Sequence, residues 1–260
     1  MDIDFNNPNF TSENIAYYTF GQGDKTLILV HGSFGSAMMW KMVIRGLMGN
    51  FRIIALDLQG HGMSNNFNLS TTTMNDYVDN IASVAKIIEG ESVLIGHSMS
   101  GLSVLMALAE GISDMAISID PSPTMEIQGK KSSEGISDTY SAMDAGMPSS
   151  GEEMAKAMPD VDAQMFPSLQ KMLGMEAGPA RRQRKEGISI SKESLENKKV
   201  LFLGAELGDS LPFGISAEST RKMAEYYQKP YVEITGASHP GMLVGKSAMK
   251  VSEEIAKFLS

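Results

Sequence analysis

Short, almost entirely apolar runs recur along this chain, and polar stretches separate them. The runs lie at residues 15–20, 26–30, 51–56, 93–95, 115–119, 200–203 and 231–234. A strand that is apolar on both faces has to be covered by helices on both sides, which is typical of parallel sheets in α/β proteins. We therefore predict an α/β fold with a mostly parallel, doubly wound sheet.

Helical spacing appears between these runs. Residues 75–89 carry apolar side chains at helical intervals, and Gly90 stands at the stop position, so a helix is expected there. A second amphipathic helix is expected at the end of the chain, around Val251 and Ile255. Residues 21–24 (Gly-Gln-Gly-Asp) predict a hairpin-like turn between the first two runs.

The stretch from Pro121 to Asn197 breaks the alternation. It contains no convincing strand and is rich in Met, Ser, Gly and charged residues. We predict an inserted, mostly helical cap (a lid) over residues 121–197, with residues 1–120 and 198–260 forming the core. The basic run Arg181-Arg182-Gln183-Arg184-Lys185 lies in this insert; a solvated helix face is the preferred interpretation, and attraction of a substrate carboxylate is the alternative.

Composition excludes several classes of protein. The net charge of −9 argues against nucleic acid or an anionic membrane as a partner, and a small-molecule substrate is expected instead. The chain has no cysteine, so it has neither disulfides nor a thiolate metal site. Its acidic start is unlike a signal peptide, and no apolar run reaches the roughly 18 residues that span a bilayer. A cytoplasmic location is the resulting expectation, while the oligomeric state stays open.

Chemistry-bearing residues gather where the predicted strands end. His31, Asp57, Ser98, Asp120, Gly204 and Gly236 all lie at or just past such ends. Open α/β sheets bind ligands outside the carboxyl ends of their strands. We therefore expect a functional site along this edge.

Residues 96–101, Gly-His-Ser-Met-Ser-Gly, stand between an apolar run and a helix-like run. A serine flanked by small residues at a strand-to-helix turn is the pattern of a nucleophile elbow, G-x-S-x-G, and predicts Ser98 as nucleophile. The last position of the pattern is Ser100, and the glycine follows as Gly101. An ordinary turn between strand and helix is the alternative interpretation.

A nucleophilic serine needs a histidine as base. The chain has four histidines. His97 directly precedes Ser98, so its side chain should diverge from the serine, while His31 and His61 sit in glycine-bounded turns that they would stabilise. His239, in a loop between the last apolar run and the final helix, is the predicted base.

An orienting carboxylate should come from a strand end between the serine and the histidine. Asp209 is the preferred candidate, and Glu206 and Asp120 are the alternatives. The competing interpretations are helix capping for Asp209, a solvated charge for Glu206 and a turn cap before Pro121 for Asp120.

A developing oxyanion needs backbone N–H donors. The first is expected at Met99, directly after the nucleophile. The second is expected in the turn at residues 31–35 (His-Gly-Ser-Phe-Gly), at Ser33 or, as second choice, at Phe34, which is also a candidate for contact with substrate.

Taken together, the chain resembles the α/β-hydrolase fold family. The resemblance rests on residues 31–35, 57–64 (Asp-Leu-Gln-Gly-His-Gly-Met-Ser), 96–101 and the loop of His239. It is similar above all to the family's serine esterase, cofactor-free peroxidase-like and C–C hydrolase branches. The resemblance implies a sheet of about eight strands, a cap domain, no cofactor or metal, and the chain order nucleophile, acid, histidine.

The expected reaction is hydrolysis of an ester of a small, largely apolar substrate through an acyl-enzyme on Ser98. Hydrolysis of C–C or amide bonds, as in iminopeptidases, uses the same groups, and a low-turnover small-molecule binding protein is an alternative outside enzymology.

Overall fold

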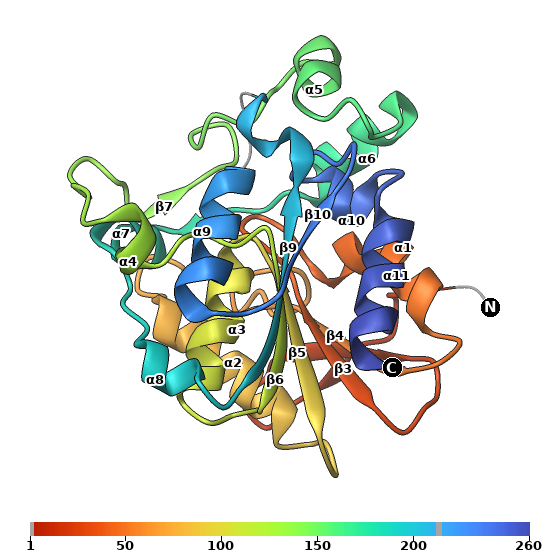
Figure 1. The fold of residues 1–260 in the computed structure, drawn as a ribbon. Coiled ribbons are helices and arrows are strands. Elements are labelled where there is room, and N and C mark those ends of the chain that lie inside the picture. Colours follow the sequence, from red (N-terminus) through yellow and green to blue (C-terminus); the bar gives the residue numbers. More distant parts are fainter. Residues whose placement is uncertain (1–2, 212–214) are drawn as a thin grey trace.

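A computed structural model describes residues 3–211 and 215–260, and its centre is an eight-stranded sheet (Figure 1). The strand order is β1-β2-β4-β3-β5-β6-β9-β10. The antiparallel pairs are β1–β2 and β2–β4, and every other neighbouring pair is parallel. The strands are β1 (Asn9–Phe10), β2 (Ala16–Phe20), β3 (Thr26–Val30), β4 (Arg52–Leu56), β5 (Ser92–His97), β6 (Met115–Ile119), β9 (Lys199–Ala205) and β10 (Tyr231–Ile234). The prediction of a mostly parallel, eight-stranded α/β sheet is confirmed.

The central strands are buried on both faces because successive side chains point to opposite sides. Leu27 and Leu29 of β3 join one apolar cluster, and Ile28 and Val30 join the other. All four side chains are fully buried. This alternation is why the run is apolar from Leu27 to Val30.

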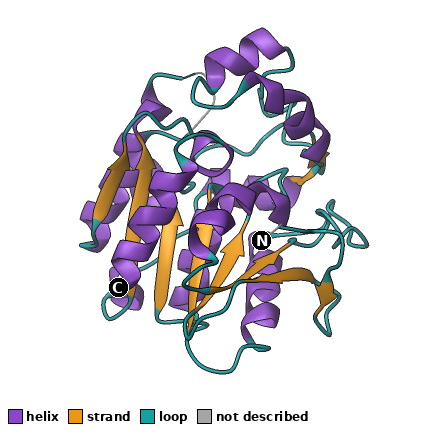
Figure 2. Cartoon of the chain, turned by 90° about the vertical axis from the view of Figure 1, so that its right-hand side faces the viewer, coloured by secondary structure: helices purple, strands orange, loops and turns teal. Residues whose placement is uncertain are grey.

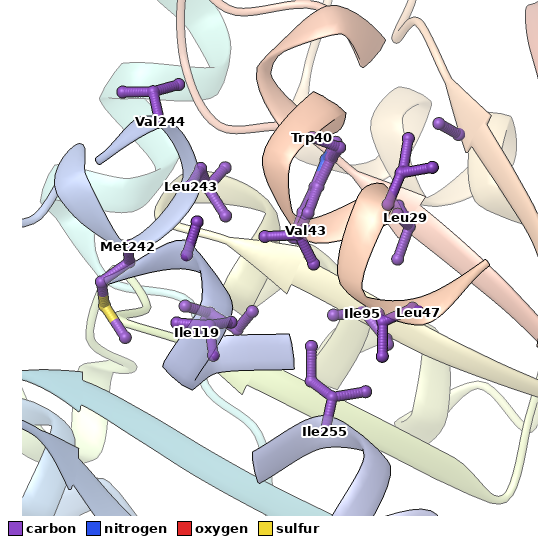
Figure 3. Packing of buried hydrophobic residues seen from close by; sticks show 14 of the residues in the cluster. Leu29, Trp40, Val43, Leu47, Ile95, Ile119, Met242, Leu243, Val244 and Ile255 are labelled. Atoms are coloured by element: carbon purple, nitrogen blue, oxygen red, sulfur yellow. The ribbon is translucent and has the colours of Figure 1, made fainter. Parts of the chain in front are cut away.

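A layer of helices covers each face of the sheet. On one face lie α1 (Lys41–Leu47), α10 (Gly241–Val244) and α11 (Ala248–Leu259). Figure 3 shows Trp40, Leu47 and Ile255 of this layer gathered over the strand residues Leu29 and Ile95. On the other face lie α2 (Met74–Ala85), α3 (Met99–Ala109), α8 (Lys192–Leu195) and α9 (Ala217–Tyr227).

The insert, residues 121–197, adds no strand to the main sheet. Before α8 it forms α4 (Met125–Gln128), β7 (Thr139–Tyr140), α5 (Gly151–Ala157), α6 (Phe166–Met172), β8 (Glu176–Ala177) and α7 (Gly178–Glu186). Figures 1 and 2 show much of it at the end of the sheet toward which the parallel strands point. Its role as a cap stays a prediction. None of the helices in the described residues is long and apolar enough to cross a membrane.

Three expectations about secondary structure were wrong. Strands β2 and β3 are not a hairpin, since β4 lies between them and pairs with both. Helix α2 ends at Ala85, after which Ile87 and Ile88 make i→i−3 hydrogen bonds that tighten the chain. The insert also contains a two-stranded sheet, in which β7 and β8 pair antiparallel.

Candidate active site

Ser98 stands between β5 and α3 in a backbone conformation that few residues adopt. Its φ of 58° and ψ of −119° turn the chain sharply. The Ser98 carbonyl accepts hydrogen bonds from the N–H groups of Gly101 and Ser122, and its own N–H donates to Ile119. A Cβ on Gly96 would lie 2.0 Å from the carbonyl oxygen of Ser100, so the turn requires glycine there. This strained, well-bonded turn is the geometry expected of a nucleophile elbow.

Ser100, the departure from the usual pattern, packs inside the turn. Its side chain is fully buried and donates a hydrogen bond of 2.5 Å to the carbonyl oxygen of His31. The glycine that follows, Gly101, packs against Pro121, whose Cβ would lie 2.7 Å from an added Cβ. The serine therefore fills space between two turns and is not among the residues that line the cavities beside Ser98.

His239 pairs with Asp120. Its Nδ1 lies 2.5 Å from the Asp120 Oδ2, and both side chains are buried. The other carboxylate oxygen accepts from the backbone N–H of Ala205 at 3.2 Å and from the Thr220 hydroxyl at 3.4 Å. Asp120 directly follows β6, which lies beside β5 in the sheet, so the chain turns of Asp120 and Ser98 are neighbours.

The preference for Asp209 as the partner of His239 was therefore wrong. Asp209 is exposed and accepts from the N–H of Glu218 in the first turn of α9, which makes it a helix-capping residue. Glu206, the second candidate, is exposed as well. It accepts from the N–H of Gly236 at 2.7 Å and thereby braces the start of the loop that carries His239.

His97 supports the His239 loop, a role that sequence reasoning missed. The His97 Nε2 lies 3.0 Å from the backbone carbonyl of His239, and the two rings stack with centroids 4.4 Å apart. Burial and the neighbouring His239 hold the pKa of His97 well below its ordinary value, so the ring is neutral. A neutral ring that meets a carbonyl through Nε2 donates its proton there.

His31 and Asp57 brace the turns around the site. Burial lowers the pKa of His31 to about 3, and the neutral ring donates to Gly32 and accepts from the N–H of Leu58. The Asp57 carboxylate accepts from the N–H groups of Ala37 and Met63. These contacts agree with the expected turn-stabilising role of His31.

The candidate oxyanion donors lie on facing turns. The Ser33 hydroxyl contacts the sulfur of Met99 at 3.4 Å. In the part of the chain that the structure describes, the backbone N–H groups of Ser33 and Met99 donate to no protein acceptor. The N–H of Phe34, in contrast, donates to the Oε2 of Glu176 at 3.3 Å. The geometry therefore favours Ser33 over Phe34 as the second donor.

Glu176 is a fully buried carboxylate that reaches from the insert into the core, and no pattern in the sequence pointed to it. It accepts from the Tyr77 hydroxyl at 2.5 Å, and its other oxygen lies 3.5 Å from the His61 Nε2. Burial opposes the charge on both groups, but their mutual attraction prevails. It lowers the pKa of Glu176 to about 2 and raises that of His61. The pair ties the insert to the turns at 31–35 and 57–64.

Two cavities meet at Ser98. The large cavity, of about 720 Å³, lies under the insert, and the small cavity, of about 70 Å³, lies on the side of Met39 and Leu243. Both are lined by Ser33, Phe34, Ser98 and His239. Ser98 and His239 thus share the wall of both cavities. Within residues 3–211 and 215–260 no group of three or more His, Cys, Asp or Glu side chains is arranged to hold a metal ion.

Comparisons with known proteins agree with this architecture. The model of the "Alpha/beta hydrolase family" matches residues 27–248. The chain is 33% identical over 79 residues to a pyrethroid hydrolase of Sphingobium wenxiniae, covering 30% of this chain and 28% of the relative. It is 30% identical over 90 residues to a pimeloyl-[acyl-carrier protein] methyl ester esterase of Yersinia pseudotuberculosis, covering 35% and 33%. The chain thus matches about a third of the length of these curated relatives.

A solved structure shows the same fold over nearly the whole chain. The bromoperoxidase of Bacillus anthracis superposes with a TM-score of 0.72 at 18% identity, covering 97% of this chain and 99% of that one.

Proposed function

Because the chain belongs to the alpha/beta hydrolase family, we propose that it is a serine hydrolase that cleaves a carboxylic ester through an acyl-enzyme on Ser98. The observation that carries the proposal is the 2.5 Å contact between His239 and the buried Asp120, at a cavity that Ser98 also lines. The methyl ester esterase among the relatives supports ester chemistry.

In this mechanism His239 is the general base. Its contact with Asp120 favours the tautomer with the proton on Nδ1, so Nε2 is the nitrogen that takes the Ser98 proton as the hydroxyl attacks the ester carbonyl. The proton then passes to the leaving alcohol, and a water molecule hydrolyses the acyl-enzyme by the same route. Asp120 stabilises the imidazolium that forms in each step.

The oxyanion of the tetrahedral intermediate would be bound by the N–H groups of Ser33 and Met99. Both N–H groups belong to backbone that the surrounding turns hold in place, so the donors need no rearrangement during the reaction. Loss of one such donor typically costs about two to three orders of magnitude in turnover.

A fluorophosphonate probe tests the proposal directly. The wild-type protein should be labelled at neutral pH, and peptide mapping should locate the adduct on Ser98. Ser98→Ala should abolish labelling. Ser103→Ala is the control and should leave labelling intact, because the hydroxyl that it removes from α3 donates to the Met99 carbonyl. A folded wild-type protein that takes up no label would contradict the proposal and favour a binding protein.

Hydrolysis of matched ester and amide substrates separates ester hydrolysis from amide hydrolysis. We expect release of alcohol from the ester at a higher kcat/KM than release of amine from the amide. The reverse order would favour the iminopeptidase-like alternative.

A further inference from the structure

Positive charge lines the large cavity. Lys131, Arg181, Arg184 and Lys185 all contribute to its wall, together with Ser98 and His239. None of the described residues of this wall is an Asp or a Glu. In a chain with a net charge of −9, such a concentration of cations beside the candidate nucleophile calls for a specific explanation.

Three of the four cations come from one helix. Residues 181, 184 and 185 are three and four positions apart on α7, so they share a face of the helix. That face lines the cavity, and the two arginines are half-buried. The preferred sequence interpretation of this basic run as a solvated face therefore does not hold for Arg181 and Arg184, whereas Lys185 is exposed as that interpretation expects. Arg182 behaves differently: it lies outside the cavity and pairs with Asp138 at 3.0 Å.

Arg184 is held close to the candidate active site. Its guanidinium lies 3.4 Å from the hydroxyl of Ser122 and 3.1 Å from that of Tyr140. The N–H of Ser122 donates in turn to the carbonyl of Ser98, so a single residue links the guanidinium to the candidate nucleophile. The Arg184 Nε is buried and has no hydrogen-bond partner among the described residues. The Nη1 and Nη2 nitrogens, which contact two hydroxyls of the cavity wall, are therefore the guanidinium atoms that can meet a ligand.

The four cations are not neutralised by carboxylates. In the described part of the chain Lys131, Arg181, Arg184 and Lys185 form no ion pair. Arg181 stacks on the Tyr140 ring, 4.3 Å from its centroid. Burial and, after it, the charges of the other three cations lower the pKa of Lys185.

Glu176 and Asp144 interact electrostatically with this cluster, but both carboxylates are hydrogen-bonded to other groups. Glu176 acts on Arg184, yet its oxygens are occupied by Tyr77, Phe34 and Ala177, with His61 beside them. Asp144, which is felt by Arg181, is exposed and bonds Ser141. The cavity therefore keeps an excess of positive charge.

The small cavity has the opposite character. Its wall is mainly apolar and includes Met39, Met147, Leu173 and Leu243. At about 70 Å³ it has room for a small group only. Ser98, at the junction of the two cavities, thus separates a small apolar site from a large cationic one.

We propose that the substrate of this site is an ester with a carboxylate or phosphate on the half that occupies the large cavity and a small uncharged group on the other half. Arg184 and Arg181 bind the anion, and Lys131 and Lys185 at the mouth attract it. The inference rests on the proposed function and replaces the sequence-based expectation of a largely apolar substrate.

Matched pairs of esters test the proposal. Monomethyl adipate and 6-acetoxyhexanoate carry a carboxylate on the acyl half and on the alcohol half respectively, and methyl hexanoate and hexyl acetate are their uncharged counterparts. At low ionic strength, at least one anionic ester should have a kcat/KM at least tenfold above its counterpart. The orientation that shows the preference identifies which half enters the large cavity. Equal or higher rates for both uncharged esters would overturn the proposal.

Variants of α7 locate the anion site. Arg184→Gln should reduce the preference for the anionic ester, measured as the ratio of its kcat/KM to that of the uncharged ester, at least tenfold. Arg182→Gln is the matched control, because it removes the same charge from the same helix outside the cavity, and it should retain the preference. Equal effects of the two variants would contradict the proposal by showing that only net charge matters. Replacing the carboxylate by a phosphate in 6-acetoxyhexyl phosphate shows which anion the site favours.

A binding measurement separates this inference from the proposed function. In Ser98→Ala protein, which cannot form an acyl-enzyme, titration calorimetry with monomethyl adipate and 6-acetoxyhexanoate measures the anion site alone. Additional Arg184→Gln should raise the Kd at least tenfold, and additional Arg182→Gln should not. Lack of binding in a protein whose wild type is labelled at Ser98 would overturn the anion site and leave the hydrolase standing. Binding of the anionic esters by a protein whose wild type is not labelled would support the anion site and contradict the hydrolase proposal.

Discussion

The imidazole Nδ1 of His239 lies 2.5 Å from the Oδ2 of Asp120, although the two residues are 119 positions apart in the chain. The aspartate follows β6 with a φ of 44°, a conformation that turns its side chain away from the path of the strand. The N–H of Ala205 and the hydroxyl of Thr220 hold its second oxygen. Residues of β9 and α9 therefore position this carboxylate for its contact with the histidine.

We expect Asp120→Asn to reduce kcat for ester hydrolysis by roughly three to four orders of magnitude, because an amide no longer holds His239 in the reactive tautomer. Circular dichroism should show an intact fold. Asp209→Asn and Glu206→Gln are the matched controls, and each should retain kcat within about threefold, since neither carboxylate contacts the histidine. A loss confined to Asp209→Asn would restore the original sequence-based assignment.

Ser100→Ala should weaken the fold slightly and leave the chemistry intact. The variant removes the hydrogen bond to the His31 carbonyl, which is worth about 1 kcal/mol. Urea unfolding measures this loss, and fluorophosphonate labelling of Ser98 should proceed at the wild-type rate. A strong decrease in labelling with unchanged stability would show that Ser100 shapes the site.

Gly32→Ala should reduce kcat about a hundredfold. The added Cβ would lie 2.9 Å from the Ser98 Cβ and 3.1 Å from the His97 carbonyl, so the nucleophile has to shift. Gly151→Ala is the control, because nothing lies within 4 Å of its added Cβ. Wild-type turnover in Gly32→Ala would show that the turn tolerates the displacement.

Glu176→Gln should destabilise the protein at neutral pH by roughly 3 kcal/mol. Folding lowers the pKa of Glu176 from its ordinary 4.5 to about 2, and each unit of pKa corresponds to about 1.4 kcal/mol. The stability contributed by the ionised carboxylate is present above pH 4.5 and is lost as the pH falls toward 2. The difference between wild type and variant, measured by urea unfolding, should therefore narrow between pH 5 and pH 3.

His61 adds a second, opposite dependence on pH. Its pKa is raised in the folded protein, so the stability contributed by its charge is present below its ordinary value of 6.5 and is lost as the pH rises through the raised value.

The exposed Glu134→Gln is the control for Glu176→Gln and should change stability by less than about 0.5 kcal/mol at every pH. A Glu176→Gln difference that stays constant from pH 3 to pH 7 would exclude the ion pair as its cause.

Local sequence was sufficient for elements whose character does not depend on distant partners. The runs at 26–30, 115–119 and 231–234 predicted β3, β6 and β10 to the residue, because an apolar run bounded by turn residues has one plausible extent. The prediction of a hairpin between β2 and β3 was wrong, since the pairing of strands depends on the whole sheet. In the same way, a lone glutamate at position 176 gives no local sign that Tyr77 and His61 will surround it.

By itself the sequence determined the α/β class, the positions of the central strands and the small residues that let the chain turn sharply at Ser98, since these follow from short-range sterics and hydrophobic periodicity. Only the tertiary structure decided which carboxylate meets His239, and which side of α7 faces the cavity. Asp120, Glu206 and Asp209 all follow strand ends and fit the same chain order. The order of the strands beside β5 decides which of these carboxylates lies near His239, and the packing of the insert decides which side of α7 faces the cavity. Both depend on contacts between residues far apart in the chain.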